Sequence, residues 1–269
     1  MATILHFFST LDPLYVLSGV LVGGLVGMTG VGGGSLMTPI LVLLFGMHPA
    51  TAVGTDLLYA SITKASGSVI HGYNRTVDWR VVGRLALGSI PATALTIAAL
   101  YFLDVGNSKG AQLLITQVLA VALLFTAISL LLRKPLMRWY GEHVPEMNPV
   151  LVRRLTILTG AILGVLVSLS SVGAGAIGVT ALVFLYPKME ARRIVGSDIA
   201  HAVPLTLIAG LGHASLGLIN WHVLGSLLTG SIPSIIVMSI VSARASDTAV
   251  RVALAIVLIL VCARFWFGN

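Results

Sequence analysis

The chain of 269 residues is poor in charge: 9% of its residues are charged, 57% are hydrophobic, and the mean hydropathy is +1.01. A soluble domain of this length cannot hide so much apolar surface, because its outer layer needs polar side chains. The composition therefore excludes an ordinary soluble enzyme or binding module. It predicts an integral membrane protein whose helices have lipid as their solvent.

Cysteine is also scarce. The single Cys262 excludes an internal disulfide and leaves the compartment undetermined. Residues 1–14 lack a basic region before the first apolar stretch, so we predict no cleavable signal peptide. The net charge of +7 comes from Lys and Arg in short segments between apolar stretches, a pattern that favours membrane topology over nucleic-acid binding.

Signatures of catalysis are missing as well. The chain has no His-Glu-x-x-His and no paired aspartates in a Gly-x-Gly-Asp context, and residues 64–67 (Lys-Ala-Ser-Gly) are only faintly similar to the Ser-Gly pair of rhomboid proteases. No specific Na⁺ site can be recognised. We therefore expect no enzyme activity, no metal and no cofactor.

The apolar residues fall into eight segments, and six of them have about the 20 residues that a spanning helix needs. The segments are 14–45, 52–72, 80–103, 110–132, 154–186, 192–214, 222–242 and 249–267. The first and the fifth are too long for one helix and too short for two full spans. Glycine-rich runs break both of them, at 29–35 and at 170–175.

Each long segment is either one broken spanning helix or a hairpin of two short helices that enters and leaves on one side. The hairpin arrangement places thirteen Lys and Arg residues on the same side of the membrane, whereas the single-span arrangement divides them. The positive-inside rule therefore favours hairpins, with both termini outside.

Two stretches of the chain repeat across 142 residues. Gly-Ser-Ile-Pro at 88–91 returns at 230–233, and Val-Gly-Thr-Asp at 53–56 returns as Val-Gly-Ser-Asp at 195–198. Duplication in a membrane protein is typical of secondary transporters. We predict an all-α membrane protein of two inverted repeats, each a broken helical hairpin plus three transmembrane helices. The repeats are 1–132 and 154–269, joined by a cytoplasmic linker at 133–153.

The two glycine-rich breaks are candidates for a substrate site, because helix ends at mid-membrane offer unpaired N–H groups to an anion. Nearby hydroxyls would add donors. The alternative is that the glycines only allow close helix packing. The candidate residues are Thr29, Gly32, Gly33, Gly34, Ser35 and Thr38 in the first half and Ser170, Ser171, Gly173 and Gly175 in the second.

Three charged residues within the apolar segments are candidates for a functional role. Asp56 and Asp198 occupy corresponding positions and either cap their helices or take part in coupling and substrate passage. Lys64 has no basic counterpart, because Thr206 stands at the matching position. It either neutralises an anionic substrate or pairs with Asp56; the alternative is that it reaches out to the membrane interface.

Three histidines are candidates for proton coupling. His71 and His213 correspond across the repeat, and His201 is the third. Histidine can carry protons near neutral pH, although a histidine satisfied by structural hydrogen bonds is the commoner case.

The glycine-rich turn at 30–35, the Ala-Val-Gly-Thr-Asp-Leu segment at 52–57 and the duplicated Gly-Ser-Ile-Pro together resemble the sulfite exporter TauE/SafE family, also called the toluene sulfonate uptake permease family. The resemblance covers about residues 14–267. It implies a multi-pass carrier of the bacterial inner membrane for small sulfur-containing anions such as sulfite or organosulfonates. The second turn, Gly-Ala-Gly-Ala at 173–176, departs from the glycine-rich form.

We therefore expect a secondary transporter that works by alternating access, in the direction of export, with protons as candidate coupling ions. An anion channel, or a carrier for a small organic anion without sulfur, is the alternative. The expected partners are the small anion, protons and the lipid bilayer, with no nucleic acid. The sequence leaves the oligomeric state open.

Overall fold

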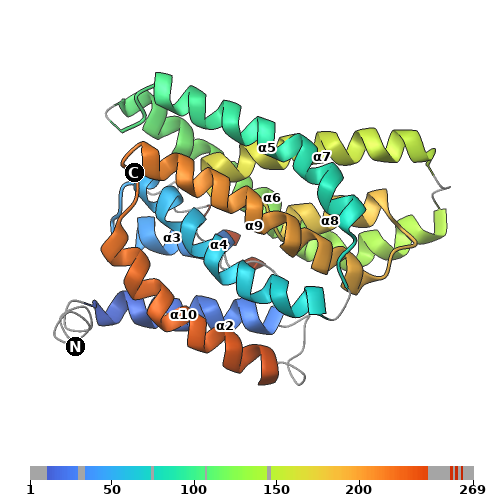
Figure 1. The fold of residues 1–269 in the computed structure, drawn as a ribbon, viewed down its shortest axis with the longest axis horizontal. Helices are drawn as coiled ribbons and strands as arrows, with labels where there is room; N and C mark the ends of the chain where they lie inside the picture. The colour runs from blue at the N-terminus through green and yellow to red at the C-terminus, as the bar shows by residue number, and fades with distance from the viewer. Residues whose placement is uncertain are drawn as a thin grey trace.

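The computed structural model describes residues 11–29, 34–73, 76–106, 108–143 and 147–241, together with 255, 256, 258, 259 and 262. In this part of the chain the regular structure is entirely helical, with nine bounded helices (Figure 1). They are α2 (Pro13–Thr29), α3 (Gly34–Leu43), α4 (Pro49–Tyr73), α5 (Trp79–Phe102), α6 (Lys109–His143), α7 (Pro149–Ser170), α8 (Ala176–Leu185), α9 (Ala191–Ser215) and α10 (Trp221–Val241). The predicted all-α fold is confirmed.

Within the described residues, five helices are long and apolar enough to cross a membrane: α5, the part of α6 up to Leu132, α7, α9 and the part of α10 up to Met238. The last predicted segment, 249–267, lies almost wholly outside the described residues. Helix α6 continues to His143, so the first half of the predicted linker is helical.

Both long apolar segments are divided into two helices, as predicted, but α7, with 22 residues, is not short and is long enough to cross a membrane by itself. The first break, at 30–33, lies outside the described residues. At the second break, Ser171 ends α7 with a φ of 58°, and Gly173 and Gly175 follow with φ values of 117° and 127°. Such backbone angles strongly favour glycine, so these two residues allow the chain to reverse before α8 begins at Ala176.

Contacts at the open ends show that both pairs of helices are hairpins. The ring of Tyr15, near the start of α2, lies 4.2 Å from the ring of Phe45, just after α3. In the second pair, the hydroxyl of Thr156 in an early turn of α7 lies 2.8 Å from the hydroxyl of Tyr186, which follows α8. The second helix of each pair therefore returns to the end of the molecule from which the first helix started.

The two hairpins open toward opposite ends of α4. The first leads directly into the start of α4, and 25 residues at about 1.5 Å each make this helix roughly 37 Å long. The second opens beside the start of α5, which follows the far end of α4, because Arg84 donates a 3.2 Å hydrogen bond to the Tyr186 hydroxyl.

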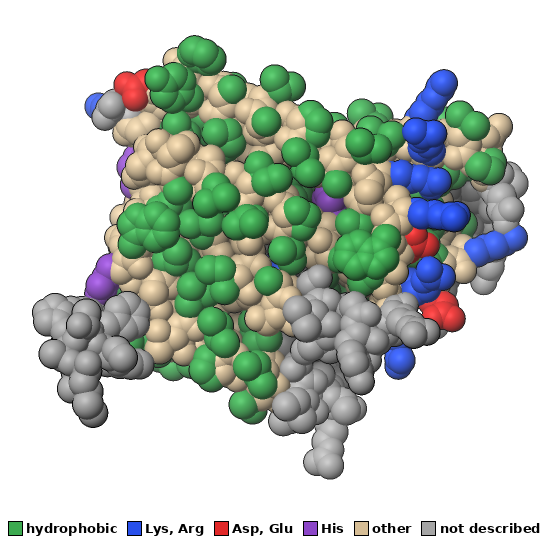
Figure 2. Space-filling model, in the orientation of Figure 1, with side chains coloured by type: hydrophobic (Ala, Val, Ile, Leu, Met, Phe, Trp, Pro, Cys, Tyr) green, Lys and Arg blue, Asp and Glu red, His purple; other side chains and the backbone are tan. Residues whose placement is uncertain are grey.

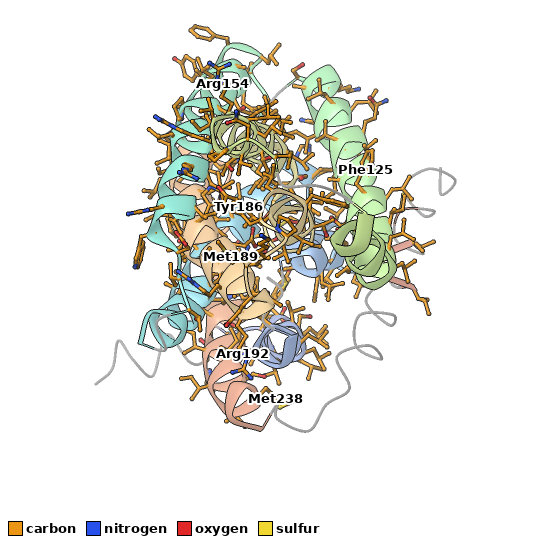
Figure 3. All side chains as sticks on the ribbon, turned by 90° about the vertical axis from the view of Figure 1, so that its right-hand side faces the viewer. Phe125, Arg154, Tyr186, Met189, Arg192 and Met238 are labelled. Atoms are coloured by element: carbon orange, nitrogen blue, oxygen red, sulfur yellow. The ribbon has the colours of Figure 1, made fainter. Side chains whose placement is uncertain are left out.

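Exposed basic side chains gather at the end of the molecule where the second hairpin opens, on the right in Figure 2. They come from the starts of α5, α7 and α9, and Figure 3 looks onto this end with Arg154 and Arg192 labelled. The exposed basic residues of these segments are Arg80, Arg153, Arg154, Lys188, Arg192 and Arg193. This gathering of charge fits the hairpin arrangement on which the topology was predicted.

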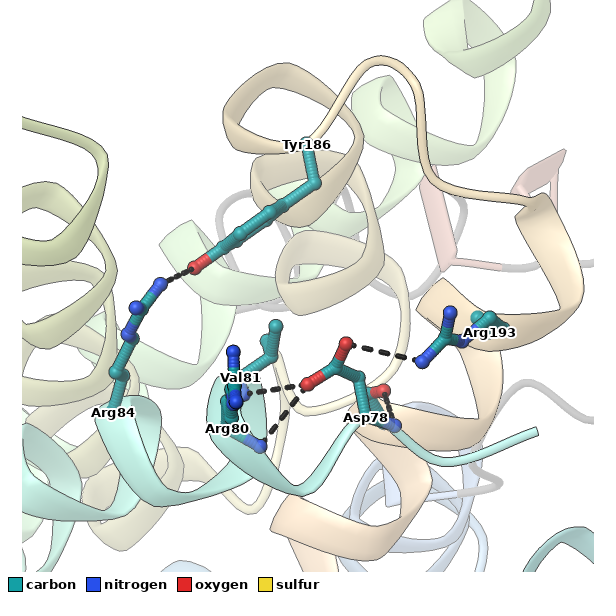
Figure 4. A network of polar contacts seen from close by, with 7 residues as sticks. Asp78, Arg80, Val81, Arg84, Tyr186 and Arg193 are labelled. Atoms are coloured by element: carbon teal, nitrogen blue, oxygen red, sulfur yellow. Dashed lines mark hydrogen bonds and ion pairs between the residues drawn. The ribbon is translucent and has the colours of Figure 1, made fainter. Parts of the chain in front are cut away.

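A network of polar contacts joins the start of α5 to the start of α9 at the end of the molecule where the basic residues gather (Figure 4). Asp78 caps α5 by accepting hydrogen bonds from the N–H groups of Arg80, at 3.0 Å, and Val81, at 3.3 Å. Its second carboxylate oxygen pairs with Arg193 of α9 at 3.2 Å. The start of α5 is therefore tied to α9 by the cap residue.

Helices pair across the two halves of the chain. Helix α2 lies along α10, α7 lies along α5, and α4 packs on α9 between these pairs (Figure 1). Glycine allows the close approach: a Cβ at Gly230 of α10 would overlap the Val16 carbonyl, and a Cβ at Gly88 of α5 would overlap that of Ile157. Gly88 and Gly230 are corresponding residues, which supports the predicted two-fold repeat. The inverted relation of its halves stays a prediction.

We expect Gly88→Ala to lower the free energy of unfolding by about 1–3 kcal/mol, because its methyl group would push α5 from α7. Gly83→Ala in the same helix is the matched control: an added methyl group there meets none of the described atoms and brings up to about 1 kcal/mol of helix propensity. Thermal unfolding in detergent compares the two variants. Equal behaviour would contradict the proposed role of close packing.

Candidate functional site

Charged and titratable side chains meet where α4 packs on α9. Asp56 and Lys64 belong to α4, and Asp198 and His201 belong to α9. None of the four is more than 3% exposed. Buried charges in a membrane protein are costly, so this cluster is the first candidate for a functional site.

The interpretation of Asp56 and Asp198 as helix caps is wrong. Helix α4 begins at Pro49 and α9 at Ala191, so both aspartates lie about two turns inside their helices. Proline is favoured in the first turn of a helix because its missing N–H group is not needed there. The helix therefore starts earlier than the apolar segment does, and Asp56 is left in the interior.

Asp56 joins α4 to the first hairpin. Its Oδ2 accepts hydrogen bonds from the backbone N–H of Thr38, at 3.1 Å, and from the Thr38 hydroxyl, at 2.5 Å. Its Oδ1 has no hydrogen-bond partner among the described residues, and the Ser171 hydroxyl lies nearby but outside hydrogen-bonding geometry. Thr38 and Ser171, both predicted site residues, therefore lie at the Asp56 carboxylate.

Lys64 joins the two halves of the chain. Its Nζ donates a 3.1 Å hydrogen bond to the carbonyl oxygen of Ala174, in the turn between α7 and α8. The ammonium group also interacts electrostatically with Asp198 and Asp56. The side chain is 3% exposed, so the alternative that Lys64 reaches out to the membrane interface is wrong.

The second aspartate lies against the second hairpin. Oδ1 of Asp198 occupies the space that a Cβ at Gly178 of α8 would need, so only glycine allows this approach. One turn further along α9, His201 Nε2 lies 2.8 Å from the hydroxyl of Ser89 on α5. The cluster therefore receives groups from α5 and α8 as well.

A tyrosine and two serines at this centre escaped the sequence analysis. Tyr59 corresponds to His201 across the 142-residue repeat, and Ser231 of α10 corresponds to Ser89. The hydroxyls of Tyr59 and Ser231 are close neighbours, although they lie outside hydrogen-bonding geometry. The duplicated Gly-Ser-Ile-Pro was the signal that could have pointed to them. Its serine in each half lies near a residue of the other half: Ser89 near His201, and Ser231 near Tyr59.

The hydroxyl before each aspartate fixes the start of another helix. Thr55 Oγ1 accepts a 3.0 Å hydrogen bond from the N–H of Asn220, which precedes α10. The corresponding Ser197 Oγ accepts a 2.8 Å hydrogen bond from the N–H of Asp78, which precedes α5. Both halves use the Val-Gly-(Thr/Ser)-Asp segment in the same way, so these contacts position the central cluster from both ends.

Other predicted site residues have local roles. Ser170 donates to the carbonyl of Leu166 at 2.7 Å and accepts from the N–H of Val172 at 3.2 Å, within its own turn. His213 Nε2 donates to the carbonyl of Ser168 at 2.9 Å and so ties α9 to α7. Gly173 and Gly175 shape the turn. These four residues lie outside the group formed by Lys64 and the aspartates.

The first glycine-rich turn lies mostly outside the described residues. Gly32 and Gly33 lie outside the described residues, as do the side chains of Thr29, Ser35 and His71. Gly34 is the first residue of α3. Their place in the site stays a prediction.

The described centre contains groups of the kinds that bind a small anion and groups that can take up or release a proton. It combines one ammonium group, two carboxylates, an imidazole and several hydroxyls in a region shielded from water, where electrostatic interactions are strong. The described residues contain no group of three or more His, Cys, Asp and Glu that would suit a metal ion.

Comparison with known proteins identifies the family. The model of the family Sulfite exporter TauE/SafE matches residues 15–265. The chain is a member of the TauE/SafE family. It is 40% identical to the probable membrane transporter protein YjnA of Bacillus subtilis over 232 residues, which are 86% of this chain and 90% of the relative. It is 29% identical to a probable membrane transporter protein of Xylella fastidiosa, over 80% of this chain and 78% of the relative. No solved structure matches.

The family and the helices agree on where the TauE/SafE protein works. It is a multi-pass membrane protein, and its relatives are named membrane transporters. The bacterial inner membrane fits a bacterial transporter of this kind.

We expect Thr38→Val to lower the free energy of unfolding by about 1–3 kcal/mol, because Asp56 would lose its shortest hydrogen bond inside the protein. Thr96→Val is the control, since the Thr96 hydroxyl donates only to the carbonyl of Ala92 in its own helix. Thermal unfolding of both purified variants is the measurement. A larger loss in the Thr96 variant would contradict the importance assigned to the Thr38–Asp56 contact.

Proposed function

We propose that this TauE/SafE protein is a secondary transporter that moves a small sulfur-containing anion, of the sulfite or organosulfonate type, by alternating access. The observation that carries the proposal is the burial of Lys64 at the contact between the two halves. A fully buried ammonium group lies between the two halves of the chain and donates to the broken turn of the second hairpin. Such a group offers further N–H donors to the oxygens of an anion.

The second break supports the choice of an anion. Helix α8 begins after Gly175 without a side-chain cap, and its N-terminal end lies in the turn to which Lys64 bonds. The N-terminal end of a helix favours negative charge, because its first N–H groups are unpaired and the helix dipole is positive there. The ammonium group and the helix end therefore attract the same ligand.

Charge balance supports coupling to protons. With Asp56, Asp198 and Lys64 all ionised, the centre carries one negative charge in excess, and an anion adds a second. Unbalanced charge is strongly unfavourable away from water. Binding of the anion together with a proton restores the balance, and the carboxylates of Asp56 and Asp198 and the imidazole of His201 are the groups that can accept it.

The arrangement of the halves supports alternating access. The hairpins open toward opposite ends of α4, as expected of an inverted repeat, and each half packs its hairpin against a helix of the other half. In our proposal the halves rock about the α4–α9 contact and expose Lys64 to either side in turn. The end rich in Arg and Lys faces the cytoplasm, and net movement of the anion is export.

A transport assay with purified protein in lipid vesicles tests the function. The vesicles are offered sulfite, sulfate, thiosulfate, sulfoacetate, taurine and simple carboxylates, with and without a pH gradient. We expect saturable movement of a sulfur oxyanion that a pH gradient drives. Movement that fails to saturate would indicate a channel, preference for a carboxylate would indicate a carrier of another anion class, and transport of none of these compounds would overturn the proposal.

We expect Lys64→Met to reduce transport at least about tenfold, because the anion loses a charged hydrogen-bond donor in a buried site. Lys109→Met is the matched control: Lys109 is exposed at the start of α6 and far along the chain from the cluster. Initial rates in vesicles, normalised to incorporated protein, compare them. Unchanged transport by the Lys64 variant would remove this residue from the mechanism.

A further inference from the structure

The centre holds buried hydroxyls that have no hydrogen-bond partner in the part of the chain that the structure describes. Tyr59, Ser171 and Ser231 are at most 2% exposed, and none of their hydroxyl oxygens has a hydrogen-bond partner among the described residues. Buried polar atoms without a partner are rare, because each lowers the stability of the fold. Ser171 lies near Asp56 and Ser231 near Tyr59, outside hydrogen-bonding geometry, so this group of hydroxyls is a candidate place for a ligand.

These hydroxyls lie around one carboxylate. Tyr59 follows Asp56 by three positions on α4, so the two side chains share a face of the helix, and they interact electrostatically. Ser171 neighbours the Asp56 carboxylate, and Ser231 neighbours the Tyr59 hydroxyl. The three hydroxyls therefore come from three different elements: α4, the turn after α7, and α10.

The residues that correspond to Tyr59 and Ser231 in the other half are His201 and Ser89, and their contacts differ. There the serine of Gly-Ser-Ile-Pro, Ser89, lies 2.8 Å from His201 Nε2, so the pair that matches Ser231 and Tyr59 is bonded within itself. The repeat thus builds the same arrangement twice, an aspartate, a ring three positions later and a serine from the opposite half. Of the two serines only Ser231 lacks a partner among the described residues.

We infer that the hydroxyls of Tyr59, Ser171 and Ser231 bind the oxygens of the transported anion, beside the ammonium group of Lys64. This site rests on the proposed transport function and names the residues that recognise the substrate. Its chemistry suits a tetrahedral or pyramidal oxyanion with three oxygens, because each hydroxyl donates one hydrogen bond to a separate acceptor. Lys64, which bonds three residues beyond Ser171 at Ala174, supplies the opposite charge.

Discrimination follows from this arrangement. A sulfonate or sulfite group presents three oxygens to three donors, whereas a carboxylate presents two and would leave one buried hydroxyl unpaired. A site with buried polar groups rejects ligands that cannot pair them, because the unpaired group costs more than the lost hydrogen bond. The three hydroxyls would therefore favour sulfur oxyanions over carboxylates of similar size.

Two variants with matched controls test this site. Tyr59→Phe and Ser231→Ala each remove only a hydroxyl. Thr63→Val on α4 and Ser226→Ala on α10 also remove a buried hydroxyl, but the Thr63 and Ser226 hydroxyls donate to carbonyls of their own helices. The probes are sulfite and sulfoacetate, with acetate for comparison, and Kd is measured by calorimetry on protein whose folding is checked by thermal unfolding.

We expect each site variant to raise the Kd for sulfite at least about tenfold, the loss of one hydrogen bond to a charged group. The acetate affinity should change less, so the preference for sulfite should shrink, and the KM for transport should rise more than kcat falls. Both control variants should keep the Kd of the wild type. If Tyr59→Phe proves unstable, Ser231→Ala and Ser171→Ala answer the same question.

The outcomes separate the site from the function. A wild-type protein that transports sulfite or sulfoacetate, with unchanged Kd in the folded variants at Tyr59, Ser171 and Ser231, would overturn the site and leave the transport function standing. An equal loss of affinity in the site variants and the controls would also overturn it, because the effect would then be structural. A wild-type protein that neither binds nor moves these probes would overturn both.

Discussion

A buried ammonium group is the constraint on which this structure depends. Away from water, the charge of Lys64 is tolerable only with partners, and those partners come from both halves: the Ala174 carbonyl, Asp56 on its own helix and Asp198 on α9. Without these partners the ammonium group would be an uncompensated charge in a region of low dielectric constant. The contact between α4 and α9 is therefore also an electrostatic requirement.

The remaining helices are held by contacts that do not rely on the hydrophobic effect, which gives little attraction between helices in lipid. Glycines allow backbones to touch between α2 and α10 and between α5 and α7. Buried hydroxyls such as Thr55 and Ser197 accept the N–H groups that precede the next helix. These contacts have direction, so they fix the register of the helices around the central charges.

The fold was largely predictable because long apolar runs, glycine-rich breaks and loop charge are each visible in a single sequence. Helix starts were less predictable. Residues 49–51, before the apolar run, also form helix, so Asp56 was misjudged as a cap candidate. Contacts between distant helices could not be derived from spacing. Lys64 was recognised by its charge alone, but its bond to Ala174 depends on how the two halves pack.

Tyr59 and Ser231 were missed for a different reason, since tyrosine and serine are ordinary in apolar helices and neither is charged. The repeat held the missing information: positions that correspond across 142 residues meet the same partners, even where the residue types differ.

Those differences matter for the mechanism. If two conformations of a duplicated transporter are related by exchanging the roles of the halves, identical halves would give them equal free energy. Here Lys64 corresponds to Thr206, and Tyr59 corresponds to His201. The Thr206 hydroxyl bonds to the carbonyl of Ala202 in its own helix and brings no charge. One half thus supplies the buried cation and the other an imidazole. In the proposed alternating-access mechanism, the two conformations would therefore have different charge environments and unequal populations, and a ligand bound better in one would shift the balance by its differential affinity.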